Sequence, residues 1–90
     1  MAHLILYSKP GCHLCEGLQE KLESLTAQGF TLEVRDITQQ PEWQQAYEYD
    51  VPVLYLVVEG QTLGVPRFSP RLSAAEIERR LQRLALERSH

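Results

Sequence analysis

The sequence predicts an α/β domain with a four-stranded mixed sheet and three helices, in the order βαβαββα. Two apolar runs, Leu4–Tyr7 and Val53–Val58, lack polar alternation, which is typical of strands inside a sheet. Across Leu14–Leu25 the leucines recur in steps of four, four and three residues, which places one apolar stripe along a helix. The segment Ser73–Glu76 has the spacing of a capping box and therefore begins a last helix.

Length and composition indicate one ordinary globular domain over residues 1–90, with 43% hydrophobic and 23% charged residues. No run approaches the roughly 18 apolar residues of a membrane span, and no basic region followed by an apolar segment and a cleavage site opens the chain. A net charge of -3 argues against general affinity for nucleic acid. We therefore expect a cytoplasmic monomer that binds neither membranes nor nucleic acid.

In the first half of the chain, Ser8–Gly11 is the turn after the first strand, and Gly29 ends the helix that follows. The alternation of apolar and polar residues over 30–35 predicts a half-covered strand at a sheet edge. A short second helix follows, because Pro41 is tolerated in a first helical turn and Trp43 and Tyr47 come at helical spacing.

In the second half, Pro52 stands before the most apolar run, the best candidate for a central strand, and Thr62–Val65 returns as its antiparallel partner through a tight hairpin. Ile77, Leu81 and Leu84 form the buried stripe of the last helix, and we expect Ser89 and His90 to fray. Right-handed crossovers place the first three strands parallel with helices over the faces, which is a thioredoxin-type layout.

The chain has two cysteines, Cys12 and Cys15, and they lie where the first strand turns into the first helix. Two residues between them allow the sulfur atoms to meet within one helical turn, so a disulfide closes without moving the rest of the fold. A loop this short restricts the unfolded chain little, so the pair is a poor staple for a secreted protein. A reactive dithiol in a reducing compartment fits better.

The position of each cysteine predicts its role. At the helix N-terminus, unpaired N–H groups and the helix dipole favour the thiolate of Cys12, which would attack. Cys15 lies one turn further in, where it stays protonated until it resolves the mixed disulfide. His13 could add a neighbouring cation or simply face solvent. Two unrelated buried thiols, or half of a zinc site, are the alternatives for the pair.

Two motifs, Tyr7–Cys15 (YSKPGCHLC) and Val51–Pro52, resemble those of the glutaredoxin-like proteins of the thioredoxin superfamily, over nearly the whole chain. The resemblance implies a thioredoxin-like fold and a cis Val51–Pro52 bond against the dithiol, where an ordinary trans turn is the alternative. It also implies that the backbone of Val51 is free to pair with an extended thiol substrate, such as glutathione or a peptide. Lys9 matches the lysine that faces the substrate carboxylate, and a solvated lysine is its alternative. Tyr7 ends the strand that leads to the dithiol and is kept as a site neighbour.

The chain departs from the usual glutaredoxin pattern in two places. Typical members carry paired glycines and an acidic residue before the last helix, whereas residues 64–69 read GVPRFS, in which only Gly64 fits. Val65 stands where a close backbone approach is expected, although Arg67 could still bind a carboxylate. His13-Leu14 replaces the frequent Pro-Tyr between the cysteines. The chain is therefore most similar to a short, non-classical glutaredoxin-like branch.

These features predict a thiol-disulfide oxidoreductase in cell redox homeostasis, in which Cys12 attacks a protein disulfide or glutathione adduct and Cys15 releases the product. The chemistry requires no dissociable cofactor, and glutathione or a thioredoxin-type reductase supplies electrons. Two other functions stay open. In a metal or iron–sulfur module, a second chain or glutathione must add ligands, because the histidines are scattered. In a non-catalytic interaction module the dithiol is idle.

Overall fold

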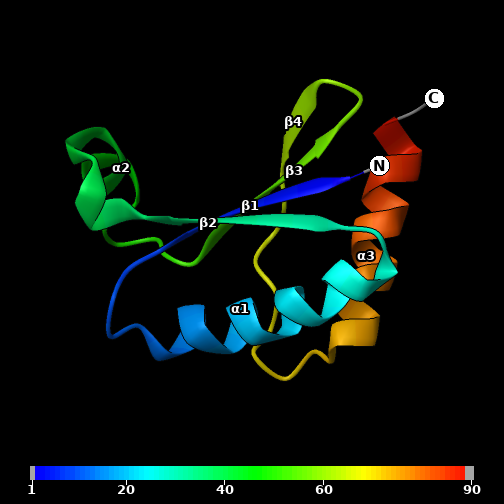
Figure 1. The fold of residues 1–90 in the computed structure, drawn as a ribbon, viewed down its shortest axis with the longest axis horizontal. Coiled ribbons are helices and arrows are strands. Elements are labelled where there is room, and N and C mark those ends of the chain that lie inside the picture. Colours follow the sequence, from blue (N-terminus) through cyan, green and yellow to red (C-terminus); the bar gives the residue numbers. More distant parts are fainter. Residues whose placement is uncertain (1, 89–90) are drawn as a thin grey trace.

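The computed structural model describes residues 2–88 and confirms the expected order of elements (Figure 1). The expectation for Ser89 and His90 lies outside the described residues. The elements, with two short 3-10 segments η1 and η2, are β1 His3–Ser8, α1 His13–Ser24, η1 Leu25–Gln28, β2 Thr31–Asp36, η2 Ile37–Gln39, α2 Pro41–Tyr47, β3 Val53–Val58, β4 Gln61–Gly64 and α3 Ala74–Arg88.

The four strands form a mixed sheet in the order β2-β1-β3-β4. The two apolar runs occupy the centre as β1 and β3, and the alternating run lies at the edge as β2, both as predicted. Strand β4 pairs antiparallel with β3 through Glu59 and Gly60, which have φ angles of 51° and 80°. Positive φ angles at both turn residues are typical of the two-residue hairpin turns whose backbone twist matches that of the flanking strands.

The direction of β3 corrects the expectation that the first three strands are parallel. Strand β1 is parallel to β2 but antiparallel to β3, with Tyr7 opposite Val53. The reason is the length of α2, because seven residues span only about 10 Å, whereas a six-residue strand spans about 20 Å. The chain therefore stays at the end of the sheet where β1 and β2 finish, and β3 starts there (Figure 1).

The core lies between one face of the sheet and the helices α1 and α3, which share a side of the sheet (Figure 1). It is made of aliphatic and aromatic side chains at most 8% exposed: Leu4, Leu6, Leu22, Leu25, Phe30, Leu54, Leu56, Ile77 and Leu81. The predicted leucine stripe of α1 is buried in its second half only. Leu14 is 52% exposed, because the first turn of α1 borders a surface groove instead of the core.

The helix ends form as their sequences predict. The Ser73 hydroxyl accepts from the Glu76 N–H at 3.2 Å, and the Ser73 N–H donates to the Glu76 carboxylate at 3.4 Å, which completes the capping box. Gly29 follows η1 with a φ of 99°, and Pro41 is the first residue of α2. Within residues 2–88, no helix has the length and apolar character that crossing a membrane requires.

Candidate active site at the dithiol

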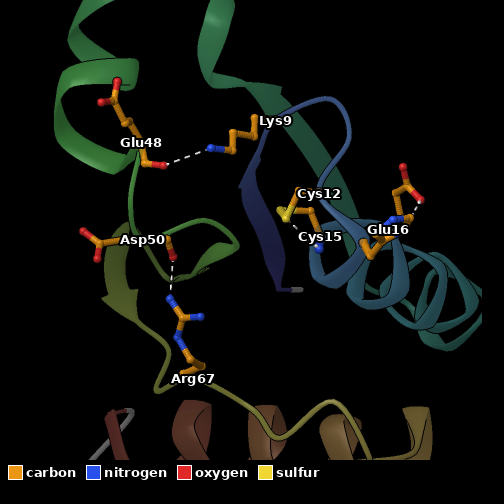
Figure 2. Close-up of a disulfide and its surroundings, with 8 residues drawn as sticks. Lys9, Cys12, Cys15, Glu16, Glu48, Asp50 and Arg67 are labelled. Carbon is orange, nitrogen blue, oxygen red and sulfur yellow. Dashed lines mark hydrogen bonds and ion pairs between the residues drawn. A yellow bond between two sulfur atoms is a disulfide. The ribbon is translucent and has the colours of Figure 1, made fainter.

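Cys12 and Cys15 form a disulfide at the N-terminus of α1, with their Cα atoms 5.2 Å apart (Figure 2). Cys12 is the N-cap residue, and its Sγ accepts a hydrogen bond from the Cys15 N–H at 3.2 Å. Its side chain is half-buried, whereas Cys15 is 1% exposed. The two sulfur atoms therefore differ in access, as their positions in the sequence predict.

Local backbone geometry explains why Cys12 caps the helix. Gly11 has a φ of 80°, a conformation that glycine adopts without steric cost, and this turns the chain out of β1. Cys12 then has extended angles, φ -92° and ψ 105°, and its carbonyl accepts the first helical bond from Glu16 at 3.0 Å. An extended N-cap aims its side chain at the free N–H groups of the first turn. One of these donors, the Cys15 N–H, reaches Sγ.

His13 faces solvent. Its side chain is 96% exposed, and Nδ1 lies 3.9 Å from the Glu16 carboxylate one turn along the helix. This is the solvent-facing arrangement that the sequence left open as the alternative. An effect of His13 on the reactivity of Cys12 stays a prediction.

Val51 and Pro52 lie at the start of β3, beside the end of β1. Their peptide bond is cis, as the resemblance implied. Pro52 lines the same groove as His13 and Leu14. The expectation that the backbone of Val51 is free is wrong for its N–H, which donates to the Tyr47 carbonyl at 3.1 Å and closes the end of α2. Among the described residues none donates to the Val51 carbonyl, and its pairing with a substrate stays a prediction.

Two cations hold the segment 48–51 from two sides (Figure 2). Lys9 Nζ donates to the Glu48 carbonyl at 3.3 Å, and Arg67 Nη2 donates to the Asp50 carbonyl at 2.5 Å. Lys9 thus lies at the site but contacts the backbone of the protein. An ammonium group has three donors, so the bond to Glu48 leaves others for a substrate carboxylate. That role of Lys9 stays a prediction.

A groove of about 450 Å³ lies beside the dithiol. Its walls are the first turns of α1, the start of β3 and the connection 65–70 between β4 and α3. Leu18, Lys21 and Phe68 line it, and the sequence analysis did not assign them to the site. The sequence feature that could have indicated the groove is the presence of two apolar residues, Val65 and Phe68, in a connection without helical or strand periodicity.

Tyr7 belongs to an aromatic cluster on the other face of the sheet. Successive strand residues point to opposite faces, so the burial of Leu6 in the core directs Tyr7 toward α2. The Tyr7 ring lies 4.4 Å from Tyr47, 5.7 Å from Trp43 and 5.9 Å from Tyr55, between centroids. Arg35 Nη1 donates to the Tyr7 hydroxyl at 2.8 Å. The structure thus places Tyr7 under α2, and its assignment as a substrate-binding neighbour stays a prediction.

Stability should fall at alkaline pH because of Tyr47. Its hydroxyl shares a 3.3 Å hydrogen bond with that of Tyr55, and this bond, followed by burial, raises the pKa of Tyr47 to about 12. A pKa above the ordinary value of about 10 means that folding favours the neutral phenol, so this stabilisation is complete below about pH 10 and is lost as pH rises through 12. Urea midpoints measured across this range should fall less in Tyr47→Phe than in the wild type. An equal fall in both proteins would contradict the assignment.

Three kinds of comparison place this geometry among known proteins. A protein-family model described as a glutaredoxin-like domain (DUF836) matches residues 3–82. Thioredoxin 1 from Thermosipho africanus has a TM-score of 0.65 at 20% identity, over 97% of both chains. A thioredoxin variant from Halobacterium salinarum has a TM-score of 0.71 at 19% identity, over 91% of this chain and 73% of the other. No curated protein sequence matches the chain.

The structural likeness confirms the thioredoxin-like fold. Such a fold with a Cys-x-x-Cys pair at disulfide distance suggests a redox function. Over residues 2–88, no three side chains of histidine, cysteine, aspartate or glutamate gather in a way that could hold a metal ion. A metal centre at Cys12 and Cys15 would therefore need ligands from outside that part of the chain.

Proposed function

Because the chain belongs to the glutaredoxin-like domain (DUF836) family, we propose that it is a thiol-disulfide oxidoreductase that reduces protein or glutathione mixed disulfides. The observation that carries this proposal is the asymmetry of the dithiol. Cys12 is half-buried at a helix N-terminus with a donor on its sulfur atom, whereas Cys15 is 1% exposed. One thiol can meet a substrate, and the other can reach only its partner.

In the proposed reaction the Cys12 thiolate attacks one sulfur atom of the substrate disulfide. The first substrate thiolate leaves and takes a proton from solvent, and a mixed disulfide with Cys12 remains. Cys15 then loses its proton and attacks Cys12 Sγ, which releases the second substrate thiol. The substrate gains two electrons and two protons, and the protein is left with the Cys12–Cys15 disulfide. The N–H groups at the start of α1 stabilise the negative sulfur at each stage.

The proposed cycle needs no dissociable cofactor, because the electrons come from the two thiols. Glutathione or a thioredoxin-type reductase would return the disulfide to the dithiol. We place this monomeric reductase in the cytoplasm, where reducing conditions return the pair to its dithiol form. We expect neither nucleic acid nor a membrane as a partner. The support is the spacing of the cysteines, whose disulfide closes too short a loop to serve as a structural staple.

Equilibration of the purified protein in glutathione redox buffers tests the function. Alkylation of free thiols, followed by mass measurement, should show one reversible two-electron transition between about -200 and -270 mV, the range of glutaredoxins and thioredoxin. A protein that forms no intramolecular disulfide across this range would contradict the proposal. Metal analysis of the same sample would then test the metal-binding alternative.

A further inference from the structure

The groove beside the dithiol is mostly apolar. Leu14 and Leu18 of α1 form one side, and Val65 and Phe68 of the connection after β4 form the other. Leu14 stands between the two cysteines and is 52% exposed. Covering this half-exposed leucine, beside the reactive sulfur atoms, with an apolar group of a ligand would favour binding.

Two positions of the backbone that borders the groove offer no N–H to a carboxylate. The Val65 N–H donates to the Leu54 carbonyl at 3.0 Å, and Pro66 has no N–H. Glutathione carries two carboxylates and an ammonium group but no apolar side chain. Bound glutathione would therefore leave Leu14, Leu18 and Phe68 uncovered. The groove therefore suits a different ligand.

The charges at the rim of the groove are predominantly positive. Lys21 Nζ donates to the Pro70 carbonyl at 2.6 Å and Arg67 to the Asp50 carbonyl at 2.5 Å, so both side chains hold the walls of the groove in place. Among the described residues that line the groove, Asp50 is the single acidic one. The rim is thus locally basic on a chain whose net charge is -3, and it complements an acidic ligand.

We propose that the groove binds an extended segment of a disulfide-bonded protein, with an apolar residue next to the substrate cysteine and acidic residues beyond it. This inference rests on the proposed function and assigns its substrate class. A volume of about 450 Å³ lies within the range of ligand pockets, about 300 to 1,000 Å³, and accommodates the apolar residue with its neighbours.

The test measures how fast the reduced protein is oxidised, in single turnovers, by a set of disulfides. The first probe is the disulfide-linked dimer of the peptide Glu-Glu-Leu-Cys-Ala-Ala, the second has serine in place of leucine, and the third has lysines in place of both glutamates. Oxidised glutathione and a small aromatic disulfide complete the set. The leucine peptide should react about tenfold faster than the serine peptide, a difference of about 1.4 kcal/mol. The lysine peptide should react several-fold more slowly at low ionic strength.

A matched pair of variants assigns the preference to the groove. Leu14→Ser should reduce the leucine-to-serine rate ratio to near one. Val34→Ser, which removes an apolar side chain that is 39% exposed on β2 and outside the groove, should leave the ratio unchanged. The ratio compares two peptides on the same variant, so a change in the intrinsic reactivity of the dithiol cancels.

Three results would overturn the substrate class: equal rates for the leucine and serine peptides, faster oxidation by glutathione disulfide than by the leucine peptide, or a preference that survives Leu14→Ser. A lysine peptide that reacts as fast as the glutamate peptide would overturn its acidic part. In each case, reduction of the small aromatic disulfide would show that the proposed function stands. Failure to reduce even that disulfide would refute the proposed function itself.

Discussion

Replacement of Cys12 by serine should lower the rate of disulfide reduction by about a thousandfold or more, because it removes the nucleophile. No other described residue can substitute for it, since the remaining thiol, that of Cys15, is 1% exposed. The measurement is the single-turnover rate with a peptide disulfide, with folding checked by circular dichroism. A serine hydroxyl can still cap α1, so the variant should fold.

Replacement of Cys15 by serine is the matched control, because it makes the same chemical change three residues away. This variant retains Cys12, so it should attack at a rate near that of the wild type but stop at the mixed disulfide with Cys12. Mass spectrometry should show the protein carrying one covalently attached peptide. Equal residual activity in both variants would contradict the roles assigned to the two thiols.

The second large effect concerns stability. Leu81→Ala should lower the free energy of unfolding by about 2 to 5 kcal/mol, because Leu81 has no exposed surface and packs in the core between α3 and the sheet. A domain of this length has a total stability of about 5 to 13 kcal/mol, so the loss would be a large fraction. Urea unfolding monitored by circular dichroism measures it.

Leu86→Ala on the same helix is the control, because it deletes the same atoms from a side chain that is 64% exposed. Its effect should be within about 0.5 kcal/mol. Similar losses in the two variants would show that α3 is not docked through the side on which Leu81 lies.

Local features could be predicted from the sequence because neighbouring residues determine them. The leucine spacing of α1, the capping box of Ser73 and Glu76, and the turn at Glu59 and Gly60 each depend on interactions within a few residues. The pairing of Cys12 with Cys15 is local in the same sense, because one helical turn separates them.

Features that depend on contacts between distant segments were missed. The N–H of Val51 is occupied because α2 ends at Tyr47, and Tyr7 faces α2 because Leu6 is taken into the core. The groove was missed for the same reason, since its walls come from α1, β3 and the connection before α3. A sequence read along its length shows that Leu14 and Phe68 are apolar but not that they share a cavity.

The sequence by itself determined the order of elements, the two central strands and the position of the dithiol at a helix N-terminus, since each follows from local spacing and burial. The tertiary structure decided the direction of β3. A seven-residue α2 is too short to return the chain to the other end of the sheet, so β3 runs antiparallel to β1. This direction brings Pro52 to the end of the sheet that carries Cys12, because a parallel β3 would have placed its start at the opposite end.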